Sequence, residues 1–311
     1  MLIRHLLPPK KLSMTAYDLN ATISRLFVYP IKSCAGVELK ETLLIETGLE
    51  FDRAWMVVDE AGEFMSQREL PRMALIQPQI KQFEMVLRAP GMLALHIALD
   101  AVEKPCKVRV WSDECAAFEM GDVAAQWFTD FLMPQRPAGM AASKLRLVRF
   151  DPAHKRASNI KWTQGQQALN QFSDGYPILV VSEGSLDELN KRLTAAGHAA
   201  VGIERFRPNI VLSGLASHDE DRTDQLHISS GEGDIVMALV KPCPRCPIPD
   251  VNPQNALSTP EVSQMLHTYR QDARVDGAIT FGMNAIVVRP DNEPFDLALA
   301  VGQTAQGMLR F

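Results

Sequence analysis

Seven short apolar or alternating segments between Ile23 and about Trp111 constrain the fold more than any other feature of this sequence. Each is rich in strand-forming residues, and Gly, Pro or charged residues separate it from the next. This spacing is typical of antiparallel strands in a barrel or sandwich. The segments are ISRLFVYPIK, VELKETLLIE, AWMVVD, MALIQPQI, FEMVLRA, LALHIAL and KVRVW.

The rest of the chain adds a few helices to this pattern. Gly121–Leu132 carries apolar residues at helical spacing, which predicts an amphipathic helix. A buried strand is expected at Pro177–Ser182, and a helix follows at Ser185–Leu193, where Ser185 and Glu188 have the spacing of a capping box. Strand and helix do not alternate as in a doubly wound sheet, so we expect a mixed, β-rich α+β fold. A further helix is expected near Ser258, and further strands at Asn209–Ser213, Gln225–Ser229, Ile235–Lys241 and Asn284–Arg289.

Composition excludes several classes of partner. The net charge is −5, so no overall field attracts a nucleic-acid polymer or an acidic membrane surface. No segment approaches the roughly 20 apolar residues that span a bilayer. The opening segment MLIRHLLPPKKLSM is interrupted by prolines and lacks a small-residue cleavage site, so we interpret it as a tail ahead of a possible start at Met14. A cytoplasmic location is expected, with the five cysteines reduced.

The most distinctive local motif is the loop Lys241–Asp250, which contains four prolines and the pair Cys243 and Cys246 around Arg245. Proline fixes φ and removes backbone donors, so the loop is stiff and cannot be a regular helix. The charge of Arg245 favours the thiolate form of its neighbour Cys246. Four interpretations stay open at this point: a structural zinc site, a thioredoxin-like redox pair, two inert buried cysteines, or one thiolate ligand to a soft metal.

Three further places offer positive charge for an anionic ligand. Arg207 and Asn209 lie at the start of a strand, Lys32 and Ser33 at the end of the first strong strand, and Arg53 just before another strand. Arginine pairs bidentately with phosphate, whereas lysine acts as a point charge. Each residue alone is typical of a solvated surface, and the spacing along the chain does not show whether they meet.

Five separated motifs occur in order along the chain: Tyr29–Gly36, Gly48–Trp55, Phe206–Asn209, Cys243–Cys246 and Phe281–Asn284. Together they resemble one known family, the MOSC proteins, named after the C-terminal domain of molybdenum cofactor sulfurase. Within it, the pattern is most similar to the mitochondrial amidoxime-reducing component and its bacterial counterparts. The resemblance implies an N-terminal tail (1–21), an N-terminal MOSC β-barrel domain (22–140) and a MOSC β-barrel domain with a few peripheral helices (141–311). The first two motifs fall in the first of these domains and the other three in the second.

The resemblance also implies a cofactor, molybdopterin with molybdenum, and gives no reason to expect pyridoxal phosphate. Cys246 matches the cysteine that completes the coordination of the metal and is therefore the implied catalytic residue. Cys243 is then a supporting residue. The residues that match cofactor contacts are Lys32, Ser33, Arg53, Gly175, Tyr176, Arg207, Asn209, Pro244, Arg245 and Asn284.

The implied activity is reduction of N-hydroxylated compounds such as amidoximes, hydroxylamines and N-hydroxylated bases. No cysteine follows Cys246, so the electrons are expected from a separate ferredoxin, flavoprotein or cytochrome. The alternative is a non-catalytic carrier of the cofactor or of sulfur, which would use the same pocket.

Overall fold

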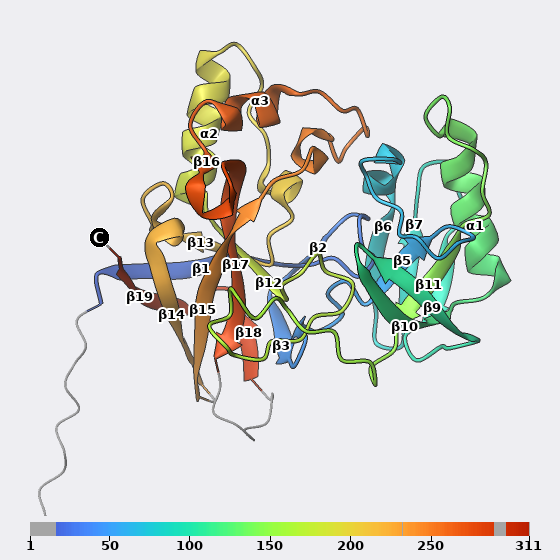
Figure 1. The fold of residues 1–311 in the computed structure, drawn as a ribbon, viewed down its shortest axis with the longest axis horizontal. Helices are drawn as coiled ribbons and strands as arrows, with labels where there is room; N and C mark the ends of the chain where they lie inside the picture. Colours follow the sequence, from blue (N-terminus) through green and yellow to red (C-terminus); the bar gives the residue numbers. More distant parts are fainter. Residues whose placement is uncertain (1–16, 232, 289–296, 311) are drawn as a thin grey trace, which may run out of the picture.

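The computed structural model describes residues 17–231, 233–288 and 297–310, and it consists of two β-rich lobes that lie side by side (Figure 1). Most of the expected tail 1–21 lies outside the described residues. Only three α-helices occur in the described part of the chain, so the predicted β-rich α+β fold is confirmed. No helix in this part is long and apolar enough to cross a membrane.

One lobe, which we call the first lobe although most of its strands lie late in the chain, is a closed barrel of seven strands. The sheet runs in the order β12-β13-β1-β19-β14-β15-β17, and β17 pairs back with β12, so the barrel has no free edge at this point. Gly282 makes this closure possible: its φ is +78°, and a Cβ there would lie 2.7 Å from the carbonyl oxygen of Val180 on β12. The strands are β1 (Leu19–Val28), β12 (Ile178–Ser182), β13 (Ile210–Ser213), β14 (Thr223–Ser230), β15 (Gly233–Pro244), β17 (Ala278–Val288) and β19 (Thr304–Leu309).

Alternating burial fills the interior of the barrel. The first residues of β1 alternate between buried and exposed, as expected for a strand with one face in a core. The interior contains Leu26, Leu226, Met237 and Ala285, all with 0% exposure. Smaller elements surround the barrel: β2 (Val37–Leu39), β3 (Glu41–Ile45), β4 (Gly48–Leu49), β16 (Gln271–Asp272), β18 (Leu297–Ala300), α2 (Glu183–Ala195) and α3 (Glu261–His267).

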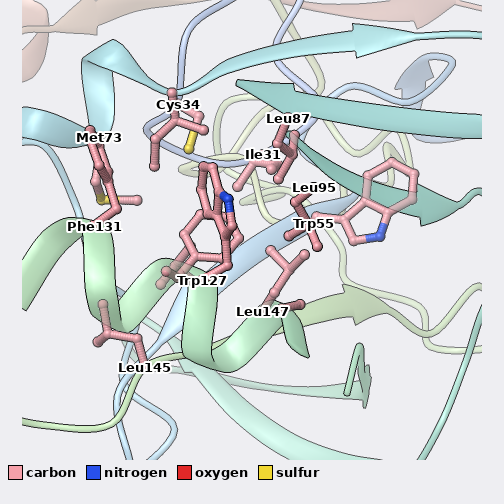
Figure 2. Close-up of a cluster of buried hydrophobic side chains, with 14 of the residues drawn as sticks. Ile31, Cys34, Trp55, Met73, Leu87, Leu95, Trp127, Phe131, Leu145 and Leu147 are labelled. Atoms are coloured by element: carbon pink, nitrogen blue, oxygen red, sulfur yellow. The ribbon is translucent and has the colours of Figure 1, made fainter. Parts of the chain in front are cut away.

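The second lobe consists of two sheets and one helix (Figure 1). These elements enclose a separate hydrophobic core. Figure 2 shows this core, where Trp127 and Phe131 of the helix lie among Trp55, Met73 and Leu147. One sheet has the order β5-β11-β10-β9 and the other β6-β7-β8. Their bounds are β5 (Trp55–Val58), β6 (Gln77–Ile80), β7 (Glu84–Arg88), β8 (Leu95–Ala98), β9 (Pro105–Val110), β10 (Asp113–Glu119), β11 (Arg146–Phe150) and α1 (Asp122–Leu132).

Strand pairing crosses the expected division at residue 140. β1 pairs with β13 and β19 and so belongs to the barrel with the C-terminal strands, although it lies early in the chain. β11 lies beyond the expected boundary but pairs with β5 and β10 in the second lobe. Strand order depends on long-range hydrogen bonds, whereas a Pro- and Gly-rich segment such as 134–142 reveals only a surface loop. The chain therefore crosses between the lobes more than once.

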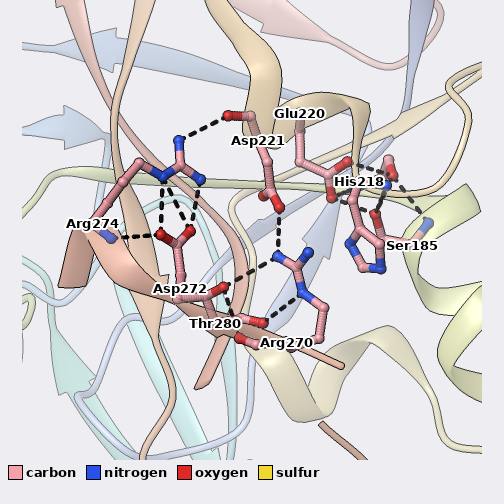
Figure 3. Close-up of polar contacts among 9 residues, drawn as sticks. Ser185, His218, Glu220, Asp221, Arg270, Asp272, Arg274 and Thr280 are labelled. Atoms are coloured by element: carbon pink, nitrogen blue, oxygen red, sulfur yellow. Dashed lines mark hydrogen bonds and ion pairs between the residues drawn. The ribbon is translucent and has the colours of Figure 1, made fainter. Parts of the chain in front are cut away.

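The segment before η4 (Asp219–Arg222) holds a histidine that should make stability depend on pH. Figure 3 shows His218 beside Glu220, whose buried carboxylate accepts hydrogen bonds from the hydroxyl groups of Ser182 and Ser185. Neither ring nitrogen of His218 has a hydrogen-bond partner among the described residues. Burial, aided by the positive charges of Arg270 and Arg192, lowers the pKa of His218 to about 3. The imidazole is therefore neutral in the folded protein at pH 5, where it would be protonated in the unfolded chain.

We expect the His218→Asn protein to lose less stability than the wild type when the pH is lowered. A lowered histidine pKa gives stability that is complete above about 6.5 and is lost as the pH falls toward 3. When the pH is lowered from 7.5 to 5, His218 should reduce the unfolding free energy of the protein by ~2 kcal/mol. Asparagine tolerates the left-handed backbone at this position (φ 64°) and does not titrate. Urea unfolding of both proteins at the two pH values measures the difference, and an equal acid loss in both would contradict this role.

Candidate functional site

A pocket between the two lobes, which we call the central pocket, brings together all the residues that the sequence singled out. They come from the loop after β1, the segment before β5, the segment before β12, the turn before β13, the end of β15 with the loop that follows it, and β17. The residues lining it include Lys32, Ser33, Arg53, Gly175, Tyr176, Arg207, Asn209, Pro244, Arg245, Cys246 and Asn284.

Backbone hydrogen bonds fix two of these segments against each other. The amide of Lys32 donates to the carbonyl oxygen of Trp55 at 2.8 Å, and the amide of Arg53 donates to that of Tyr29 at 2.8 Å. The loop that carries Lys32 and the segment that carries Arg53 therefore form one ladder at the floor of the pocket. This pairing explains why residues from two separate motifs reach the same place.

The cysteine loop leaves β15 at the rim of the pocket. β15 ends at Pro244, and the amide of Arg245 donates to the carbonyl oxygen of Ile279 on β17 at 2.9 Å. Cys246 is half-buried and lines the pocket, so its sulfur is not sealed in the interior. Prolines on both sides restrict the backbone around this thiol. In the part of the chain that the structure describes, no group of three or more His, Cys, Asp or Glu side chains could hold a metal, so a multi-ligand zinc site finds no support.

The guanidinium of Arg245 contacts the other cysteine of the loop, Cys243. Its Nη1 lies 3.1 Å from Sγ of Cys243, and its Nη2 donates to the carbonyl oxygen of Phe206 at 2.9 Å. In an extended segment, side chains two residues apart share one side, whereas adjacent side chains point to opposite sides. Nε of Arg245 is buried and has no partner among the described residues.

Two arginines enclose one tyrosine ring. The guanidinium carbons of Arg53 and Arg207 lie 4.3 Å and 4.2 Å from the centre of the Tyr29 ring. Arg53 also binds the buried carboxylate of Asp52 and donates to the carbonyl oxygen of Arg207 at 3.1 Å. Both arginines have left-handed backbones, with φ of 51° and 56°. Non-glycine residues in this conformation are concentrated at functional sites.

Arg207 has unused capacity to bind an anion. Its Nη1 donates to the carbonyl oxygen of Cys34 at 2.6 Å, but its Nη2 is buried without a partner among the described residues. Burial, together with the nearby positive charge of Arg53, lowers the pKa of Arg207 to about 10. Two cations in partial burial and a free N–H donor together favour a bound anion.

Lys32 is less available than the sequence suggested. Its side chain is buried, and Nζ donates to the carbonyl oxygen of Phe172 at 2.8 Å and to Oδ1 of Asp174 at 2.5 Å. Burial lowers the pKa of Lys32, and the attraction of Asp174 opposes this shift. The ammonium group of Lys32 is therefore already paired with Asp174 at the pocket. Ser33 has a left-handed backbone with φ 68°, and its carbonyl oxygen accepts from Gln67 at 2.7 Å.

The two asparagines play different structural parts. Asn209 is buried and braces the pocket: its Oδ1 accepts from the amide of Leu179 and its Nδ2 donates to the carbonyl oxygen of Phe27. Nδ2 of Asn284 donates a hydrogen bond to the carbonyl oxygen of Lys241 at 3.3 Å. Neither contact was foreseen from the sequence.

The segment before β12 contributes a tyrosine and a glycine. The hydroxyl of Tyr176 is buried without a partner among the described residues, and burial raises its pKa to about 12. A Cβ at Gly175 would meet nothing within 4 Å, so the glycine leaves open space there.

Some lining residues were missed by the sequence reasoning. Phe64, Arg68 and Asp174 all line the central pocket. They lie in loops without a strand boundary or motif to mark them, and the pairing of Asp174 with Lys32 spans 142 residues. No signal in a single sequence would have found them.

The fold and pocket together define a two-lobed β-barrel protein with a basic pocket and a half-buried thiol at its rim. The chain belongs to the MOSC family: residues 20–135 match the MOSC N-terminal beta barrel domain, and residues 168–305 match the MOSC domain.

Named relatives agree with this assignment. The chain is 35% identical over 260 residues to mitochondrial amidoxime reducing component 2 of Rattus norvegicus, covering 80% of this chain and 72% of the relative. It is 33% identical to mitochondrial amidoxime-reducing component 1 of Homo sapiens, with the same shares. It is also 27% identical to the molybdenum cofactor sulfurase of Bos taurus, covering 80% of this chain and 29% of that protein. The family and these relatives point to an association with the molybdenum cofactor.

Proposed function

We propose that this protein is a molybdenum-cofactor-dependent reductase of N-hydroxylated compounds that receives electrons from a separate redox protein. One observation carries the proposal: the central pocket combines a half-buried thiol, Cys246, with unpartnered guanidinium N–H groups on Arg207 and Arg245. The names of the amidoxime-reducing relatives support the choice of substrate class.

The side chains present fit a cofactor that is anionic and carries a soft metal. Thiolate sulfur is a preferred ligand of soft metal centres, so Cys246 would be the protein ligand to molybdenum. Arg53, Arg207 and Arg245 would hold the anionic pterin through charge-assisted hydrogen bonds. When bound, the molybdenum cofactor supplies two-electron redox chemistry.

The protein would contribute position and electrostatics. The stiff cysteine loop would hold the thiol in one place at little entropic cost, since its prolines are already restricted in the unfolded chain. The buried Asn209 would keep the loop before β13 at a fixed distance from the floor of the pocket through its contacts with β1 and β12.

The test is turnover by protein purified from a molybdenum-competent host. We expect stoichiometric molybdenum and pterin, and reduction of benzamidoxime to benzamidine with reduced methyl viologen as an artificial electron donor. Protein that contains neither metal nor pterin would overturn the proposal. Cofactor-loaded protein without turnover, which transfers its cofactor to an apo-molybdoenzyme, would identify the chain as a carrier.

A further inference from the structure

A second pocket, which we call the outer pocket, adjoins the central pocket and is not explained by cofactor binding. Trp111, Ser112 and Asp113, from the hairpin between β9 and β10, line part of it. Residues shared by both pockets form a common wall, among them Asp174, Tyr176, Cys243 and Asn284. Trp111 and Lys241 line only the outer pocket. A molecule in the outer pocket would therefore lie directly against the proposed cofactor site.

Two of the charges that line the outer pocket are carboxylates with partners. Oδ2 of Asp113 lies 2.8 Å from Nε of the buried Arg156, and Asp174 lies 2.5 Å from Nζ of Lys32. Lys241 has no carboxylate partner among the described residues. The charge left uncompensated in the outer pocket is therefore positive.

Lys241 is held at the pocket by its surroundings. Its carbonyl oxygen accepts from Asn284, and a β-bulge in β15 lies between Leu239 and Lys241. Its ammonium nitrogen lies 5.4 Å from the centre of the Trp162 ring and 5.8 Å from that of Tyr176. Aromatic faces attract a cation without neutralising it. The ammonium group thus keeps its capacity for an anionic partner.

Trp111 adds a flat aromatic surface to the lining of the outer pocket. Trp111 is 46% exposed although it is large and apolar, and its backbone is left-handed with φ 56°. Its Nε1 donates to Oδ1 of Asp174 at 3.3 Å, and its ring meets Phe64 edge-to-face with centres 4.9 Å apart. A bulky residue in this backbone conformation costs on the order of 1–3 kcal/mol and persists where other contacts impose it. The guanidinium carbon of Arg68 lies 4.7 Å from the centre of this ring, so a planar ligand would stack on the part of the ring that stays exposed.

We propose that the outer pocket is the substrate subsite and that it selects aromatic N-hydroxylated compounds bearing a carboxylate group. The aromatic ring of the substrate would stack on Trp111 and its carboxylate would pair with Lys241, which leaves the N-hydroxyl group toward the wall shared with the central pocket. This inference rests on the proposed reductase function. It adds a preference for anionic substrates that the function alone does not imply.

The test compares three ligands of similar size and different charge. Binding of 4-carboxybenzamidoxime, benzamidoxime and 4-(aminomethyl)benzamidoxime is measured by isothermal titration calorimetry on protein purified from a molybdenum-competent host. We expect the carboxylate to bind roughly five- to tenfold more tightly than the neutral ligand, as for one charge-assisted contact in a partly buried site. Lys241→Gln should remove this preference and Lys241→Arg should keep it.

Two matched controls separate the charge from the rings. Lys161 also lies over Trp162, at 5.8 Å, but does not line the outer pocket, so Lys161→Gln should leave the preference intact. Trp111→Leu should weaken the binding of all three ligands to the same extent, whereas Trp111→Phe should retain most of the affinity for each.

Three results would overturn the inference. They are equal binding of all three ligands to the wild-type protein, an unchanged carboxylate preference in Lys241→Gln, and loss of molybdenum and pterin from that variant, which would assign Lys241 to the cofactor. Charge-dependent binding without turnover would instead contradict the reductase function and leave the subsite in place.

Discussion

Replacement of Cys246 by serine is expected to abolish reduction of benzamidoxime while leaving the fold intact. Serine is nearly isosteric but offers a hard hydroxyl where a soft metal requires sulfur. Changes to groups that only orient metal ligands typically cost 10–100-fold, and loss of the ligand itself should exceed roughly 100-fold. Cys246 is half-buried at the rim of a pocket. The unfolding free energy of the Cys246→Ser protein should therefore differ from that of the wild type by less than about 0.5 kcal/mol.

Cys243→Ser is the matched control, because both cysteines lie in the same proline-rich loop and line the same pocket. Cys243 contacts Arg245, so its replacement should reduce the activity only partly. The measurements are the rate with reduced methyl viologen, the molybdenum content, and urea unfolding of each variant. Full turnover by Cys246→Ser, or an equal loss in both variants, would remove Cys246 from its proposed role.

The sequence predicted elements better than it predicted their partners. Alternating burial on β1 and the apolar face of α1 follow from residue periodicity, which a sequence displays directly. Barrel closure does not, because it depends on β12 pairing with β17 more than 100 residues away. The early strand β1 joined the C-terminal strands for the same reason.

Helix capping shows how a local rule can select the wrong residue. The serine expected to cap α2 was Ser185, but the helix begins at Glu183 and Ser182 caps it by accepting from the amide of Ser185. Glu188, the expected acid of the capping box, instead pairs with Arg192 one turn later. Only Ser185 has a glutamate three residues later, so the spacing rule selects it, whereas the end of the preceding strand at Ser182 determines the actual cap.

At the site, motifs identified the residues and the fold determined their contacts. The sequence identified Lys32, Arg53 and Arg207 as cations but could not show that they share a pocket. It also could not show that Lys32 is already paired with Asp174, or that Arg207 is left with a free donor. These properties depend on which buried groups meet after folding. Because Arg207 keeps a free donor and Lys32 does not, Arg207 is the cation to test first.

Arg207→Gln is therefore expected to lower the molybdenum and pterin content of the purified protein about tenfold or more. A hydrogen bond to a charged group contributes about 1.5–3 kcal/mol, which corresponds to roughly 10–100-fold in affinity. The unfolding free energy of the cofactor-free protein should change much less, because the lost contact with Cys34 is offset by relief of repulsion from Arg53. Both glutamine and lysine would bear the same left-handed backbone, so Arg207→Lys, which keeps the charge but loses the planar fork, should retain an intermediate content.

Arg205→Gln is the control for this variant, since Arg205 lies two residues earlier, binds the carbonyl oxygen of Pro249 and does not line the central pocket. Pterin fluorescence after oxidation and elemental analysis of molybdenum measure the cofactor content of each protein. Arg207 would have no part in cofactor binding if Arg207→Gln kept a full complement, or if Arg205→Gln lost as much. A selective loss at Arg207 would show that the unpartnered guanidinium N–H group is the one that an anionic cofactor completes.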